Sequence, residues 1–372
     1  MEPLRDADPT AIGGYALVCR IGDGGMGQVF LGESPAGHQA AVKVIKPSIL
    51  DEDTRLRFRS EVESLRTVYG PFVAAFVGAD ADADPPWLAV EYVNGPDLRS
   101  FVADYGPLPL VETASLGALL AEGLGTIHDA GLLHRDLKPQ NILLAAYGPK
   151  VIDFGLAVLA ERRTALTATG FVVGSVLCMP PEQARGGHRL DRSADVYGLG
   201  AVLLFAATGH YPYEGRTWQA VALNIEDPTV PPDLTGLPPE LRPLVTEMLA
   251  ADPGARPTLP EVTERLVRVI RGQGLTAFQA KRRLTDRTPE IALPQLPAEL
   301  SAGTDTVAPY TPAVLDVAAE EDDEQAPASQ PEPDEPTPDA SRGVGRPTGV
   351  RPTAPLQIAE RIRAGYARGA RF

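Results

Sequence analysis

At 372 residues the chain is long enough for two domains, or for one two-lobed domain with an appendage. Hydrophobic residues make up 44% and charged residues 22%, and no run approaches the ~18 consecutive apolar residues of a membrane span. The net charge of −15 with no basic face argues against nucleic-acid binding, and the 2 cysteines and 5 scattered histidines exclude a disulfide framework and a metal cluster.

The composition divides the chain into three parts. Residues 1–14 are predicted to be a flexible N-terminus, and their acids and prolines do not resemble a secretory signal, so we expect a cytoplasmic protein. Over 15–271, apolar strand-like runs alternate with helical periodicity, which predicts one folded domain. Proline, alanine and acids dominate from residue 272 onward, so we place the domain boundary there.

The first chemical signal is a glycine-rich segment with the spacing G-x-G-x-x-G. It comprises Ile21, Gly22, Asp23, Gly24, Gly25, Met26, Gly27, Gln28 and Val29. Dinucleotide-binding folds share this spacing, but there the third glycine opens a helix, whereas here the chain continues as a strand. The pattern therefore favours a hairpin whose glycine backbone N–H groups approach phosphate oxygens closely. An ordinary glycine-rich hairpin is the alternative.

A lysine in the middle of an apolar strand is the second signal. Residues 40–45 predict a buried strand around Lys43, whose ammonium is costly to bury unless phosphate or carboxylate partners are present. In the following helix, Glu61 flanks the apolar face and is the predicted carboxylate partner of Lys43. Glu63 is the alternative, but its position points further toward solvent.

The third signal is a polar loop between a helix and an apolar strand. His134, Asp136, Lys138 and Asn141 lie within eight residues, after a helix with leucines at helical spacing. Asp153-Phe154-Gly155 follows twelve residues beyond Asn141, at the end of another strand-like run. Polar side chains held between apolar elements are typical of a functional loop on a rigid scaffold.

With these motifs in order, the chain resembles the eukaryotic-like (Hanks-type) protein serine/threonine kinases, particularly a bacterial, actinobacterial-looking branch. The resemblance covers about Tyr15 to Ile270. It implies an α+β, bilobal protein kinase fold with a small β-rich lobe over 15–93 and a larger helical lobe over 94–271. A largely disordered tail over 272–372 would follow the domain.

The resemblance also implies roles for individual residues. Asp136 would orient the attacking hydroxyl, with Lys138 beside the γ-phosphate as in serine/threonine kinases. Asn141 and Asp153 would hold Mg²⁺, with Mn²⁺ as an alternative, and Lys43 would bind the α- and β-phosphates of ATP. Such roles fit phosphoryl transfer, which depends on positioning and on neutralising phosphate charge.

The resemblance further places an adenine-binding hinge after residue 87. Backbone groups of Glu91 and Val93 would bind adenine, Ala41 would complete the nucleotide site, and Val90 would occupy the gatekeeper position. A small valine there predicts a roomy back pocket that tolerates bulky ATP analogues.

In the activation segment the resemblance implies an ion pair between Glu182 and Arg256. Pro180 and Cys178 depart from the family pattern, so substrate preference near the acceptor is not carried over. Arg135 suggests regulation by a phosphorylated activation segment, with Thr167 and Thr169 as the candidate autophosphorylation sites.

Two residues receive structural roles by the same resemblance. Asp195, in a helix too apolar for a surface position, is expected to accept backbone hydrogen bonds from the catalytic loop. His134 is expected to pack near Phe154 rather than to carry a proton.

The sequence favours an active kinase of the non-specific serine/threonine type acting on protein substrates. A nucleotide-binding pseudokinase scaffold is the alternative, and a small-molecule phosphotransferase ranks lowest, because the chain has Glu182 and Arg256. Ten acids and no lysine or arginine lie in 316–340, a stretch predicted to be solvated and extended. Composition predicts that this tail is flexible, and recruitment of protein partners by it is a further hypothesis. Its basic end over 341–372 is expected to be disordered rather than a docking helix.

Overall fold

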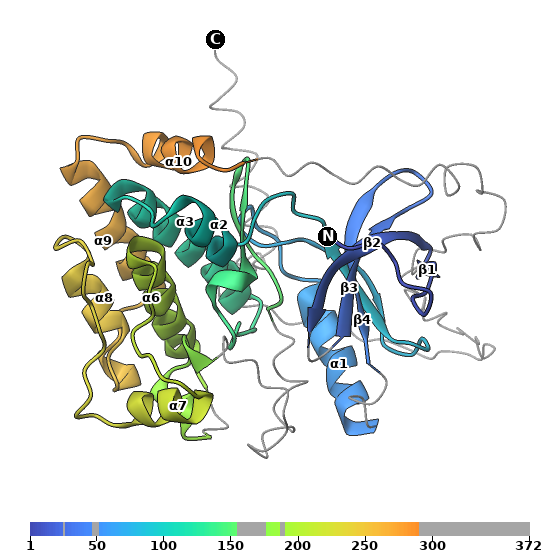
Figure 1. Ribbon diagram of the computed structural model, residues 1–372, viewed down its shortest axis with the longest axis horizontal. Helices are drawn as coiled ribbons and strands as arrows, with labels where there is room; N and C mark the ends of the chain where they lie inside the picture. Colours follow the sequence, from blue (N-terminus) through green and yellow to red (C-terminus); the bar gives the residue numbers. More distant parts are fainter. Residues whose placement is uncertain (25–26, 47–51, 155–175, 187–189, 290–372) are drawn as a thin grey trace, which may run out of the picture. The chain divides into compact units, whose positions relative to one another are not determined.

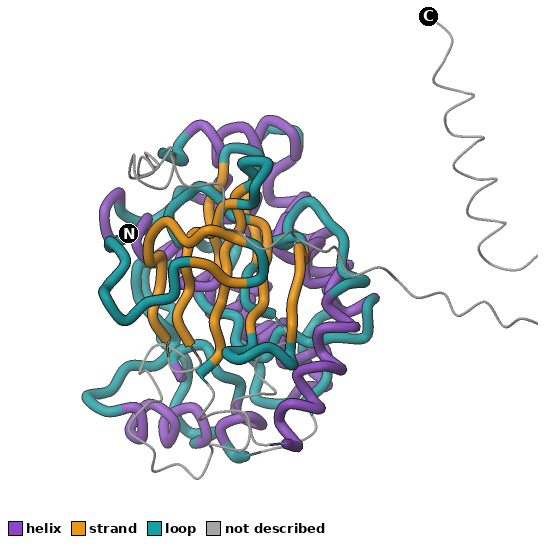
Figure 2. Tube along the Cα trace, turned by 90° about the vertical axis from the view of Figure 1, so that its right-hand side faces the viewer, coloured by secondary structure: helices purple, strands orange, loops and turns teal. Residues whose placement is uncertain are grey.

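A computed structural model describes residues 1–24, 27–46, 52–154, 176–186 and 190–289. The N-terminal part is a six-stranded antiparallel sheet in the order β1-β2-β3-β4-β6-β5. Its strands are β1 (Ala11–Ile12), β2 (Tyr15–Gly24), β3 (Gly27–Glu33), β4 (Gln39–Ile45), β5 (Phe76–Asp80) and β6 (Trp87–Glu91). The strands run side by side in Figure 2.

Helix α1 (Glu52–Leu65) joins the sheet portion and lies beside it in Figure 1. Its Phe58, Val62 and Leu65 are buried, as their shared helical face predicts. They belong to the same core cluster as Ile45 of β4 and many residues of the helical portion. One continuous core therefore runs from the sheet portion into the helices.

The helical portion forms the larger part of the fold. Its helices are α2 (Leu98–Tyr105), α3 (Leu110–Asp129), α5 (Pro181–Ala184), α6 (Arg192–Thr208), α7 (Trp218–Glu226), α8 (Arg242–Met248), α9 (Leu259–Gly272) and α10 (Ala277–Asp286), with the short 3₁₀ helices η2 (Pro139–Asn141) and η5 (Pro253–Ala255). A two-stranded sheet of β7 (Ile142–Ala145) and β8 (Gly148–Val151) completes it. This division confirms the predicted α+β, two-lobed fold.

Helix α3 lies at the centre of the helical portion, in contact with α6, α9, α10 and β8. It has the length and composition of a membrane span, yet most of it is buried inside the fold. Leu116, Leu120, Leu124 and Ile127 are fully buried. This burial is typical of a core helix.

Backbone hydrogen bonds connect the sheet portion to the helical portion at the segment between α1 and β5. Val73 forms a parallel bridge with Val151 of β8, and Ala74 N–H donates to the Val151 carbonyl at 2.9 Å. The Val151 N–H in turn donates to the Phe72 carbonyl at 2.9 Å. The strand that leads to Asp153 is therefore fixed against the segment entering the six-stranded sheet.

Both predicted domain boundaries differ from the structure. Residues 1–14 pack on the sheet: β1 pairs with β2, Glu2 forms an antiparallel bridge with Arg20, and Arg20 Nε donates to Asp8 Oδ2 at 2.6 Å. These contacts differ from the flexible N-terminus that the sequence predicted.

The folded part also continues beyond residue 271. Helix α10 begins with a capping box of Thr276 and Gln279 and packs against α3, α9 and β8, with Ala280 and Leu284 buried. The described fold therefore continues past the predicted boundary at 272, because a change in composition does not exclude a short amphipathic helix. The acidic and basic parts of the predicted tail lie outside the described residues.

Candidate functional site

The glycine-rich segment forms the predicted hairpin of β2 and β3, with Gly24 paired to Gly27. Gly27 has a packing reason to be glycine, because an added Cβ would lie 2.0 Å from the Val44 carbonyl oxygen of β4. At Gly22, by contrast, a Cβ would meet only ordinary contacts with Val29. Gly25 and Met26, at the tip of the predicted loop, lie outside the described residues.

Lys43 lies in the middle of β4, paired with Val29 of β3 and Leu88 of β6. Its side chain is 13% exposed, and its Nζ lies 2.9 Å from Oδ2 of Asp153. Loss of water around the carboxyl would raise the pKa of Asp153, but the Lys43 ammonium outweighs this and holds that pKa below its ordinary value.

This ion pair differs from the predicted one. Among the described residues, the carboxylate that pairs with Lys43 is that of Asp153, and no ion pair joins Lys43 to Glu61. Glu63, the alternative partner, has a side chain that is 74% exposed and lies 3.6 Å from Arg66. The partner differs because the relation of α1 to β4 depends on tertiary packing, which the helical pattern of α1 does not determine.

The polar loop brings Asp136, Lys138 and Asn141 together. Lys138 Nζ lies 2.6 Å from Asp136 Oδ2, and Asn141 Nδ2 donates to the Asp136 carbonyl at 2.8 Å. The Ile152 N–H donates to the Asn141 carbonyl at 3.0 Å, which ties the loop to the residue before Asp153. The predicted catalytic and metal-binding residues are thus held in one network.

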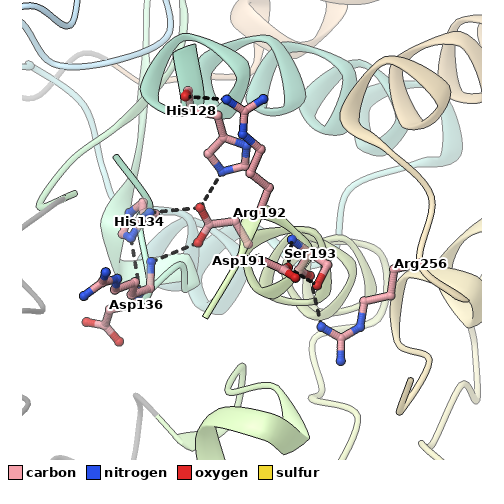
Figure 3. A network of polar contacts seen from close by, with 9 residues as sticks. His128, His134, Asp136, Asp191, Arg192, Ser193 and Arg256 are labelled. Atoms are coloured by element: carbon pink, nitrogen blue, oxygen red, sulfur yellow. Dashed lines mark hydrogen bonds and ion pairs between the residues drawn. The ribbon is translucent and has the colours of Figure 1, made fainter. Parts of the chain in front are cut away.

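Asp195 of α6 anchors this loop, and Figure 3 shows how His128, His134 and Asp136 of the same network lie. Its carboxylate accepts the backbone N–H groups of His134 and Arg135, each at 2.9 Å, and contacts His128 Nε2 at 2.7 Å. Burial would raise the pKa of Asp195, but these donors hold it below its ordinary value. The expected backbone hydrogen bonds to Asp195 are therefore present.

His134 is fully buried, and its two ring nitrogens have different neighbours. The Asp136 N–H points at Nδ1 at 3.3 Å, and Nε2 lies 3.1 Å from the Ile152 carbonyl oxygen. A ring that accepts at Nδ1 and donates at Nε2 satisfies both contacts in the neutral form. His134 thereby joins Asp136 to the residue before Asp153.

The predicted ion pair between Glu182 and Arg256 is present and bidentate. Arg256 Nη1 and Nη2 each donate to a Glu182 carboxylate oxygen at 2.7 Å, and Arg256 Nε donates to the Ala250 carbonyl at 2.9 Å. The guanidinium also stacks over Tyr197, 5.0 Å from the ring centroid. Such geometry is the strong form of a carboxylate–arginine contact.

Pro180 and Cys178, the two departures from the family pattern, are both accommodated by their surroundings. Pro180 is the N-cap of α5, where its carbonyl accepts the N–H groups of Gln183 and Ala184 at 3.0 Å. A missing N–H costs little at that position. Cys178 is buried, which raises the pKa of its thiol far above the ordinary value and keeps it unreactive.

At the predicted hinge, Ala41 pairs with Val90, and Val93 is buried. The Glu91 side chain makes contacts that the sequence did not indicate. Its Oε2 accepts from Lys150 Nζ of β8 at 2.8 Å and from the Ala75 N–H at 3.1 Å. These contacts tie the hinge to the small sheet of the helical portion.

A second residue missed from the sequence is Gln183, whose Nε2 donates to the Arg135 carbonyl at 3.1 Å. Neither Lys150 nor Gln183 belongs to a spaced motif, so pattern reasoning had no means of finding them. Thr167 and Thr169, the predicted autophosphorylation sites, lie outside the described residues.

Comparison with known proteins places this arrangement in context. A family model described as "Protein kinase domain" matches residues 15–266. The probable serine/threonine-protein kinase PkwA of Thermomonospora curvata is 46% identical over 267 residues, which are 72% of this chain and 35% of that protein.

Two further relatives carry similar names. Serine/threonine-protein kinase AfsK of Streptomyces coelicolor is 40% identical, over 74% of this chain and 34% of its own length. Serine/threonine-protein kinase PknB of Mycobacterium leprae is 35% identical, over 70% of this chain and 43% of its own. The chain thus spans only about a third of the length of the first two relatives.

Proposed function

Because this chain belongs to the protein kinase family, we propose that it is an ATP- and Mg²⁺-dependent protein serine/threonine kinase. One observation carries the proposal. Lys43 and Asp153 are in contact, Asp136 contacts both Lys138 and Asn141, and the Ile152 backbone links the two groups. A carboxylate, two ammonium groups and two oxygen ligands are the set that phosphoryl transfer requires.

Asp136 is proposed to orient the serine or threonine hydroxyl. The hydroxyl oxygen attacks the γ-phosphorus in line, the bond to the β-phosphate oxygen breaks, and the hydroxyl proton passes to the carboxylate. Lys138, 2.6 Å from Asp136, would place its positive charge beside the transferred phosphoryl group. ADP and a phosphorylated protein are the products.

The residues present fit a magnesium ion. Asp153 supplies a carboxylate, and Asn141 donates through Nδ2, so its Oδ1 faces away from that bond and accepts none among the described residues. No cluster of three or more His, Cys, Asp or Glu side chains occurs in the described part of the chain. Mg²⁺ held by one or two protein oxygens and by substrate phosphates matches this donor set, and Mn²⁺ could replace it. When bound, the ion neutralises charge on the phosphates.

Lys43 is proposed to exchange partners when nucleotide binds. Its ammonium would leave Asp153 for the α- and β-phosphates and for Glu61, and Asp153 would turn to the metal ion. The adenine would meet the backbone of Glu91 and Val93 beside Val90, with the glycine-rich hairpin above the phosphates. The Lys43 side chain is 13% exposed and that of Asp153 is 39% exposed, so solvent reaches this ion pair.

The proposal includes autophosphorylation at Thr167 and Thr169, with Arg135 pairing with the added phosphate. Mass spectrometry of the purified chain should find phosphate on these residues, and Thr167→Ala with Thr169→Ala should lower activity. Full activity of a chain that carries no phosphate at either residue would remove this part of the proposal.

The deciding experiment is the transfer of labelled phosphate from Mg·ATP to casein and to the chain itself, with wild type beside Asp136→Asn. We expect transfer by wild type and a loss of at least about a hundredfold in the variant. A wild-type chain that binds Mg·ATP without transferring phosphate would instead be a pseudokinase scaffold. Protein substrates, a cytoplasmic location and partners recruited by the tail over 272–372 stay predictions. A pull-down with the residues after 272, compared with the kinase portion, tests whether the tail recruits partners.

A further inference from the structure

The backbone at Arg135 adopts an unfavourable conformation. Arg135 and Asp153 are the two non-glycine residues with positive φ in the described part of the chain, at 63° and 58°. A non-glycine residue in the left-handed region is strained and persists only where its surroundings hold it. The contacts that hold Arg135 therefore determine where the next residue, Asp136, places its carboxylate.

Two side chains from different elements hold the two peptide groups of Arg135. Its N–H donates to Asp195 Oδ1 of α6 at 2.9 Å. Its carbonyl, which belongs to the peptide bond with Asp136, accepts from Gln183 Nε2 of α5 at 3.1 Å. Asp195 thus fixes the peptide before Arg135, and Gln183 fixes the peptide after it.

Gln183 is itself held in place. The adjacent Glu182 is clamped by Arg256 in the bidentate ion pair, and the Gln183 N–H donates to the Pro180 carbonyl at 3.0 Å. The amide orientation is determined by its partner, since an amide oxygen facing the Arg135 carbonyl would repel it. Its buried Oε1 accepts no hydrogen bond among the described residues, so the donated bond is the contact that the amide makes there.

We propose that Gln183 is a positioning residue for phosphoryl transfer, which holds the Arg135–Asp136 peptide and so aligns the Asp136 carboxylate with the acceptor hydroxyl. The inference rests on the proposed kinase activity and deepens it. It joins the end of the activation segment, at Pro181–Ala184, to the catalytic loop through one hydrogen bond. Any displacement of Glu182 would then reach Asp136 through its neighbour.

The test uses the full chain and measures kcat and the KM for ATP with casein as substrate. Gln183→Met keeps the length of the side chain and removes the donor, and we expect kcat to fall about tenfold while the KM for ATP stays within about twofold. Gln219→Met, on an exposed position of α7, is the matched control and should keep wild-type kcat. All assays are run at a temperature at which circular dichroism shows each variant to be folded.

A second variant gives a pH readout that a purely structural role would not produce. In Gln183→Glu the ionised carboxylate can only accept hydrogen bonds, whereas the protonated carboxyl can donate to the Arg135 carbonyl. The ratio of the variant kcat to the wild-type kcat should therefore rise as pH falls from about 8 to about 6.

Each result has a defined meaning. Wild-type kcat in Gln183→Met, with or without a lower melting temperature, would overturn the inference, and so would equal losses in the Gln219→Met control. If Gln183→Met does not fold, the Gln183→Glu series decides, and a ratio that does not change with pH overturns the inference. A wild-type chain without transfer would overturn the proposed function, and this inference with it, whereas an active wild type isolates the result on Gln183.

Discussion

Substitution of Leu284 tests whether α10 belongs to the folded domain. This helix lies beyond the residues matched by the family model, yet Leu284 is 2% exposed against the core. Leucine-to-alanine changes at such positions cost about 2–5 kcal/mol, so we expect Leu284→Ala to lower the free energy of unfolding by about 3 kcal/mol. For a domain of this size, that corresponds to a fall in melting temperature of about 6–12 °C.

The measurement is thermal and urea unfolding of the full chain, followed by circular dichroism. Phe278→Ala is the matched control, because Phe278 lies on the same helix but is 75% exposed, and its change should stay within about 0.5 kcal/mol. Equal melting temperatures for wild type and Leu284→Ala would show that α10 does not dock and would restore a domain boundary near residue 272. If both variants lose stability, the loss comes from a weakened helix α10 rather than from the buried contacts of Leu284.

Three further predictions concern the anchors of the site. Asp195→Asn should lower the free energy of unfolding by about 3–5 kcal/mol, because the carboxylate accepts three hydrogen bonds in a buried place. The pKa of Asp195 is lowered in the folded state, so the difference in free energy of unfolding between wild type and variant should hold above the ordinary pKa of 3.8 and narrow as pH falls below it. If that difference grows toward acid pH, the assignment is contradicted. Arg256→Lys should cost about 2 kcal/mol in urea unfolding, because lysine cannot reproduce the two parallel bonds to Glu182, and a variant as stable as wild type would show that charge alone suffices. Lys150→Met should raise the KM for ATP by about three- to tenfold with a smaller change in kcat, because Lys150 holds Glu91 at the hinge, and an unchanged KM would remove that role.

Motif spacing predicted which polar side chains the fold brings together, because the family pattern fixes their order along the chain. Asp136, Asn141 and Asp153 could be found from the sequence, and so could the Glu182–Arg256 pair and the hydrogen bonds to Asp195. These contacts join short segments whose chemistry allows few alternatives.

Contacts set by tertiary packing could not be predicted in the same way. The ion pair of Lys43 with Asp153 depends on where α1 lies, and Glu91–Lys150 depends on how β8 meets the hinge. Helix α10 is a different case, since Thr276 and Gln279 form a capping-box pattern that is visible in the sequence. The acidic and proline-rich composition of the residues beyond 272 masked that local signal.

The central position of α3 has a consequence for how the domain comes apart. Because α6, α9, α10 and β8 all contact this one apolar helix, none of them can detach without exposing it to water. The free-energy cost of releasing the first of these elements from α3 is therefore large, and releasing each further element costs less. Such sharing favours a single cooperative unfolding transition for the helical portion, without stable partly opened forms in which α10 or α9 alone is released.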